Sequence, residues 1–115
     1  MENKIVEALR ELRIPMGNLG FKYIEKAVSV VLENENCINS LTKPGGIYEE
    51  VAKHYGTAPS RVERAIRHAI ETGFKAADKE TLIKYFGHSN TKETNKNFIA
   101  SMVYMVKKEA AKSEN

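Results

Sequence analysis

Three arginines, Arg61, Arg64 and Arg67, recur at every third residue of a segment that also carries Glu63. A guanidinium group can form two hydrogen bonds with O6 and N7 of guanine, or with phosphate oxygens. A glutamate carboxylate can accept a hydrogen bond from the amino group of cytosine. If these side chains share the exposed face of a helix, they form a surface suited to the major groove of DNA.

A helical wheel drawn from Ser60 separates the apolar residues of this segment from the polar ones. With successive residues about 100° apart, one arc of roughly 140° to 280° holds only apolar side chains: Val62, Ala65, Ile66, Ala69 and Ile70. The rest of the wheel holds Ser60, Arg61, Glu63, Arg64, Arg67, His68 and Glu71. We therefore predict an amphipathic helix from about Pro59 to Thr72, with its charged face left open.

The position of each polar residue along this helix predicts its role. We expect base contacts from the middle of the helix, from Glu63, Arg64 and Arg67. Backbone phosphate is expected near the amino end, because free amides and the helix dipole favour an anion there. The residues expected to make backbone or neighbouring contacts are Ser60, Arg61, His68 and Lys75, with the further lysines Lys43, Lys92 and Lys96 on the flanks.

The same charges have a simpler interpretation, in which they form a solvated helical face. Glu63 and Arg67, and likewise Arg67 and Glu71, have the i, i+4 spacing of stabilising ion pairs. In this interpretation His68 and the flanking lysines are ordinary surface residues without a contact to DNA. Arginine rather than lysine on this face, directly after the turn described next, favours contact with DNA.

The residues before the charged helix match the first half of a helix-turn-helix. We predict a short helix from Ile47 to Tyr55 that Gly56 ends, with Thr57 capping the next helix and Pro59 in its first turn. Such a motif needs a small residue where the helices cross, a glycine that can turn left-handed, and apolar residues between the helices. The motif then lies between Tyr48 and Thr72. The small and apolar residues that would lock it are Val51, Ala52, Tyr55, Val62 and Ile66.

Helical periodicity also dominates the rest of the chain. We expect two helices on either side of residues 15–17, the second capped by Asn18, and a turn over residues 34–46. A short helix from Asp78 or Lys79 to Phe86 should precede a surface loop over residues 87–97 and a last helix from Phe98. These elements predict an all-α fold, a compact bundle of about six helices that forms a single domain over residues 1–115.

The composition fits a globular protein and excludes several other classes. At 115 residues the chain has room for one core, and an apolar share of 42% with 29% charged residues argues against disorder. It has neither an export signal nor an apolar run near the roughly 20 residues that span a membrane. Cys37 is the only cysteine, which excludes an internal disulfide and a cysteine zinc site within the chain. We expect a cytoplasmic protein.

Charge and histidine spacing favour a binding protein over an enzyme. The net charge is only +3, but residues 53–79 hold six basic residues against three acidic ones, so the excess lies in the middle of the chain. His54, His68 and His88 lack metal-ligand spacing, and no serine or cysteine has an evident base. We expect no catalysis, no cofactor and no bound metal.

The run from Ser60 to Glu71, SRVERAIRHAIE, resembles the recognition helix of the sporulation master regulator, the response regulator that starts endospore formation in Gram-positive bacteria. Weaker similarity extends over most of the chain, including residues 20–23, 48–55 and 92–100. This sequence contains no counterpart of the family's receiver domain with its phosphorylated aspartate. The segment Lys43 to Ile47 is also longer than in the family.

The resemblance implies a six-helix effector domain that binds short DNA boxes, usually as tandem copies, to activate or repress sporulation genes. It also implies contact with RNA polymerase, and association of adjacent copies through the final helix. The family's base contacts match Glu63, Arg64 and Arg67. Its neighbouring contacts match Ser60, Arg61 and His68.

A second interpretation is an interaction module without a receiver, which modulates a full-length regulator or RNA polymerase and does not read DNA itself. Tyr104 and Met105 lie off the main apolar face predicted for the last helix. In this interpretation they mark the partner surface.

Overall fold

In a computed structural model of the chain, residues 2–90 and 93–113 are described, and they form six α-helices, one 3-10 helix and no strand. In chain order the elements are α1 (Glu2–Glu11), α2 (Leu19–Glu33), η1 (Glu35–Ser40), α3 (Ile47–Tyr55), α4 (Pro59–Ala76), α5 (Lys79–Phe86) and α6 (Asn95–Ser113). The predicted all-α class, with about six helices, is confirmed. None of the described helices is long and apolar enough to cross a membrane.

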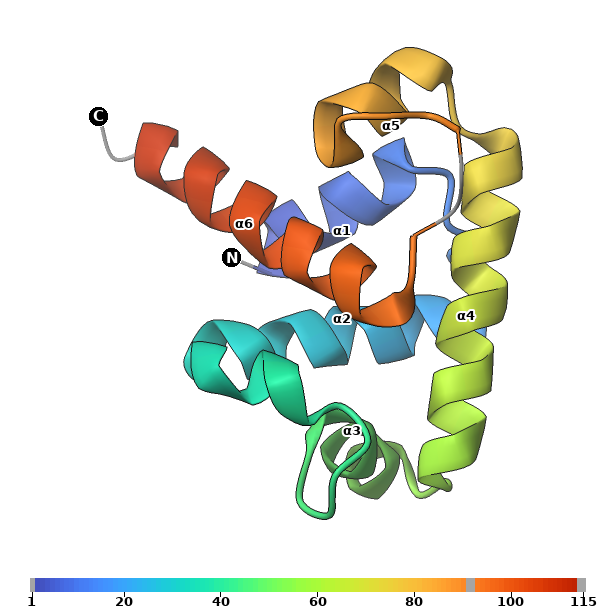
Figure 1. The fold of residues 1–115 in the computed structure, drawn as a ribbon, viewed down its shortest axis with the longest axis vertical. Helices are drawn as coiled ribbons and strands as arrows, with labels where there is room; N and C mark the ends of the chain where they lie inside the picture. Colours follow the sequence, from blue (N-terminus) through green and yellow to red (C-terminus); the bar gives the residue numbers. More distant parts are fainter. Residues whose placement is uncertain (1, 91–92, 114–115) are drawn as a thin grey trace.

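Helix α2 is the central element of the bundle (Figure 1). It packs against α1, α3, α4 and α6, while α4 runs along one side of the molecule and α6 crosses over α1 and α2. Along α2, Phe21, Ile24 and Val28 follow the spacing of a helical stripe, and all three are buried. This stripe meets the apolar faces of α3, α4 and α6 in one core, so the position of α4 is set mainly by α2 and α3.

Helix α4 is longer than the predicted Pro59 to Thr72, because Gly73 does not end it. Gly73 is buried inside the helix, and a Cβ atom there would lie 2.5 Å from Cδ1 of Ile14 and 2.9 Å from the carbonyl oxygen of Leu12. The glycine serves close packing against the α1–α2 connection. The helix continues to Ala76, where the amide of Ala77 still donates to the Gly73 carbonyl.

The predicted cap of α4 by Thr57 is wrong. The residue at the N-cap is Ala58, which has no capping side chain. The amide of Thr57 instead donates to the carbonyl oxygen of Ala52 at 2.9 Å, so this residue completes the end of α3. Asn18 does stand at the N-cap of α2, but its side chain makes no capping hydrogen bond.

Helix α6 begins at Asn95, three residues before the predicted Phe98, because Thr94 caps it. The Thr94 hydroxyl accepts a hydrogen bond from the Asn97 amide at 3.1 Å. The helix packs against α1, α2, α4, α5 and η1, so its buried face is wider than a single stripe. Met105 is therefore only 8% exposed and does not fit the partner surface of the second interpretation, whereas Tyr104 is 64% exposed.

Candidate nucleic-acid interface

Helices α3 and α4 form the predicted helix-turn-helix, and Gly56 makes the turn. Gly56 has a left-handed backbone with φ 67° and ψ 42°, which an L side chain would strain. Its amide donates to the Ala52 carbonyl, and the chain then reverses into α4. Val51 of α3 and Val62 and Ile66 of α4 are all fully buried, so the two helices are locked by apolar contact.

Helix α4 has two opposed faces, as the helical wheel predicted. Its buried residues are Val62, Ile66, Ala69, Ile70 and Gly73. Its exposed polar residues include Ser60, Arg61, Arg64, Arg67, His68 and Lys75. Because the apolar face packs on α2 and α3, the charged face points away from the bundle.

The three arginines of α4 are not engaged inside the fold. Within residues 2–90 and 93–113, the ion pairs leave out Arg61 and Arg64. Nη1 of Arg67 lies 3.4 Å from Oε1 of Glu63, and these side chains are 52% and 33% exposed. The ion pair of the simpler interpretation is therefore present for Glu63 and Arg67, and it lies at the surface.

Glu63 is the least exposed of the expected base contacts. Its Oε2 atom is shielded from solvent and has no hydrogen-bond partner among the described residues. Its other oxygen, Oε1, faces Arg67, and the side chain as a whole is 33% exposed.

Two shallow, overlapping grooves lie beside the amino half of α4, and Tyr48, Glu63 and Arg67 line both of them. One has a volume of about 360 Å³ and brings Lys43 of the α3 entry loop next to Ser60, Glu63, Arg64 and Arg67. The other, of about 420 Å³, has Lys96 at its edge and also contains Glu63 and Arg67. The expected base contacts therefore line the same grooves as two lysine-bearing segments. His68 and Lys75 are exposed farther along α4, and Lys92 lies outside the described residues.

The structure adds two residues that the sequence did not single out, Tyr48 and Asn95. Nδ2 of Asn95 donates to Oη of Tyr48 at 2.9 Å and to the backbone carbonyl of Glu63 at 3.1 Å. Burial raises the pKa of the Tyr48 phenol above its ordinary value. Asn95 lies in the polar stretch 87–97, where neither periodicity nor a motif marked it for this role.

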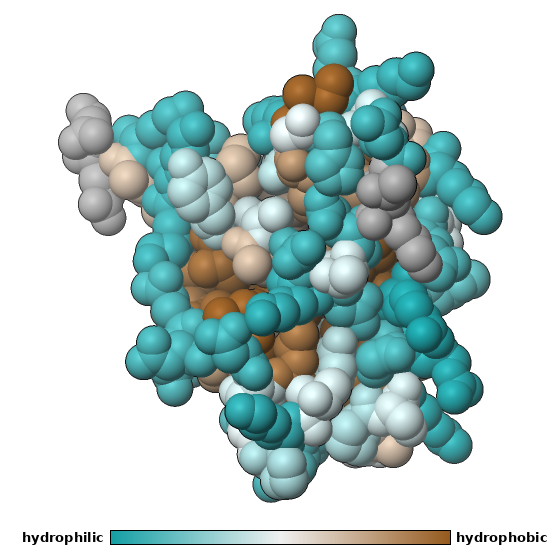
Figure 2. Space-filling model, in the orientation of Figure 1, coloured by the Kyte–Doolittle hydropathy of each residue, from teal (hydrophilic) through white to brown (hydrophobic). Residues whose placement is uncertain are grey.

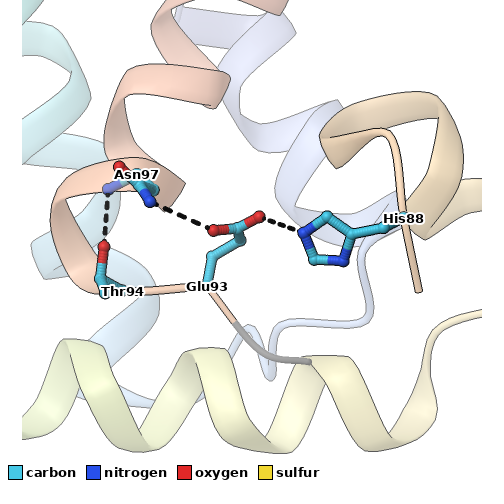
Figure 3. Close-up of polar contacts among 4 residues, drawn as sticks. All are labelled: His88, Glu93, Thr94 and Asn97. Atoms are coloured by element: carbon cyan, nitrogen blue, oxygen red, sulfur yellow. Dashed lines mark hydrogen bonds and ion pairs between the residues drawn. The ribbon is translucent and has the colours of Figure 1, made fainter. Parts of the chain in front are cut away.

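A set of polar contacts holds the chain just before α6 (Figure 3). Nε2 of His88 lies 2.7 Å from Oε1 of Glu93, and Oε2 of the same carboxylate accepts from Nδ2 of Asn97 at 3.4 Å. With the Thr94 cap, these contacts tie the end of α5 to the start of α6. His88 is thus a structural residue here, and the described residues contain no group of three or more His, Cys, Asp and Glu side chains that could hold a metal ion.

The comparison with known families agrees with this geometry. A family model described as the C-terminal region of the sporulation initiation factor Spo0A matches residues 5–106 of the 115-residue chain. The match includes the helix-turn-helix, the two grooves and most of α6. It therefore covers the whole candidate interface, including every residue of α4 named above.

Proposed function

We propose that this chain, which belongs to the family of the Spo0A C-terminal domain, reads short DNA boxes in the major groove with α4. The family is a DNA-binding domain that regulates transcription in sporulation. The observation that carries the proposal is the pair of opposed faces of α4. The buried face fixes the helix on the bundle, and the other presents Arg61 and Arg64 without a carboxylate partner among the described residues.

The surface ion pair of Glu63 and Arg67 does not oppose this role, because the pair stabilises the free protein only slightly. Exposed i, i+4 pairs contribute about 0.3–0.5 kcal/mol, whereas one bidentate contact to a base discriminates by about 1–3 kcal/mol. The pair is therefore too weak to hold these two side chains away from a base edge. In this proposal Arg64 and Arg67 donate to guanine, and Glu63 accepts from cytosine.

Backbone phosphate contacts would fix the register of α4 in the groove. The first turn of α4 has no side-chain cap, so Ser60 and Arg61 lie where a phosphate finds an open helix end. Lys43 and Lys96, which line the two overlapping grooves, would contact further phosphates, as would His68 and Lys75 farther along the helix.

We predict that Lys75→Ala weakens binding to every duplex by a similar factor. Lys75 is exposed in the last turn of α4 and would contact only phosphate. Loss of one phosphate contact removes about one released counterion, so the slope of log K against log salt should fall by about one. Titrations at several salt concentrations measure this slope. A change in base preference would contradict a phosphate role.

Binding-site selection from random duplexes tests the whole proposal. We expect an enriched short box, and a gel shift at modest salt should show tighter binding to that box than to a scrambled duplex of equal composition. Equal binding to both duplexes would contradict base reading and favour the interaction module.

We further propose that α6 supports assembly on tandem boxes or contact with RNA polymerase. An apolar groove of about 500 Å³ lies between α2, η1 and α6, lined by Val31, Ile38, Val103 and Tyr104 among others. Figure 2 shows apolar surface gathered in this region. If selected sites occur as pairs at constant spacing, the groove is the first surface to test by substitution at Tyr104.

A further inference from the structure

We propose that Asn95 positions the recognition helix, so that base preference depends on a residue that itself does not contact DNA. This role rests on the proposed function of α4. Asn95 is the first residue of α6, yet its side chain reaches α3 and α4. One amide group thus joins α6 to both helices of the helix-turn-helix.

The two acceptors of this amide lie at the centre of the candidate interface. The Glu63 carbonyl belongs to an expected base contact, and in an α-helix the same carbonyl faces the amide of the residue four positions later, which is Arg67. A shift of this carbonyl therefore moves the backbone that carries both side chains. A base contact requires hydrogen-bond geometry, so a small displacement of α4 weakens it.

The other acceptor, Tyr48, carries the link to α3. Its side chain is buried, with the residue 5% exposed, and Asn95 donates to its hydroxyl at 2.9 Å. A buried hydroxyl that loses its partner costs free energy unless the surroundings shift. Removing the Asn95 amide therefore favours a rearrangement of α3 against α4, which are the two halves of the helix-turn-helix.

Asn95 is well placed to act as a fixed reference, because its own backbone is anchored. Thr94 caps α6 at the backbone amide of Asn97, and the next residue before it, Glu93, bonds His88; neither contact uses the Asn97 side chain. The buried Phe98 and Ile99 hold the first turn of α6 in the core. Asn95 thus links the core-bound start of α6 to the backbone of α4.

Asn95→Ala tests the role, with Asn97→Ala as the matched control. Both variants remove an asparagine amide from the first turn of α6, but the Asn97 side chain bonds Glu93 and does not reach α3 or α4. We measure the dissociation constants for the selected box and for its scrambled duplex, well below the melting temperature of each variant. Asn95→Ala should lower the ratio of scrambled to box dissociation constants by about tenfold, which is the size expected when one base contact is weakened. Asn97→Ala should keep the wild-type ratio.

Tyr48→Phe provides a second variant that keeps Asn95 and removes only one acceptor. It should lower the same ratio by roughly threefold, with little change for the scrambled duplex. If the wild type prefers its box and both Asn95→Ala and Tyr48→Phe keep that preference, the positioning role is wrong while the proposed function stands. A wild type without preference for any box overturns the proposed function, and this role with it.

Discussion

Arg64→Ala should weaken binding to the selected box by roughly 5- to 150-fold, equivalent to about 1–3 kcal/mol, and relax preference at one base position. Arg64 is exposed and has no ion-pair partner among the described residues, so its removal breaks no contact in the free protein. The expected loss therefore arises only in the complex. Binding-site selection repeated with the variant would show which position of the box loses its preference.

Arg10→Ala is the matched control for this experiment. It removes the same charge from an exposed position of α1, a helix outside the helix-turn-helix. We expect its effect on box and scrambled duplex to be small and equal. If Arg64→Ala also weakened both duplexes equally, Arg64 would be a phosphate contact and its assignment to a base would be wrong.

The helix-turn-helix could be predicted because its signals are local. The wheel from Ser60 separates two faces, and the structure buries one of them and exposes the other. The predicted bounds of α3, Ile47 and Tyr55, agree with the structure, since a glycine in the left-handed region ends the helix. Periodicity and turn chemistry act over a few residues, and the sequence displays them directly.

Contacts between distant segments could not be predicted in this way. Gly73 resembles a helix stop, and only its proximity to Ile14 explains why α4 continues. Met105 lies off the expected apolar face, but α6 is surrounded by neighbours and buries it. Asn95 reaches residues 47 and 32 positions away, and nothing near it in the sequence marks those partners. The arrangement around the interface therefore depends on the packing of the whole bundle.

Gly20 shows how strongly this packing constrains α4. Gly20 lies near the start of α2, where α2 crosses α4, and it is buried. A Cβ atom at this position would lie 2.5 Å from the carbonyl oxygen of Ala65 and 2.6 Å from the Cβ atom of Ala69. Both atoms belong to the middle of α4, and neither can be moved by changing a side-chain rotamer. The two helices can approach this closely only because residue 20 has no side chain.

We therefore expect Gly20→Ala to destabilise the protein by about 1–3 kcal/mol, the usual cost of overpacking a core. The replacement of glycine by alanine within a helix by itself favours folding by up to about 1 kcal/mol. The clash should exceed this gain, because relief of two contacts near 2.5 Å requires α2 and α4 to separate. Urea unfolding followed by circular dichroism measures the difference.

Gly17→Ala provides the control, since a Cβ atom there would meet no atom within 4 Å. It reduces the freedom of the unfolded chain in the same way, so we expect unchanged or slightly higher stability. A Gly20→Ala protein as stable as this control would mean that α2 and α4 can separate at little cost. The position of α4 would then not be fixed by the core, and the buried face of the helix could not be what holds its arginines in place for DNA.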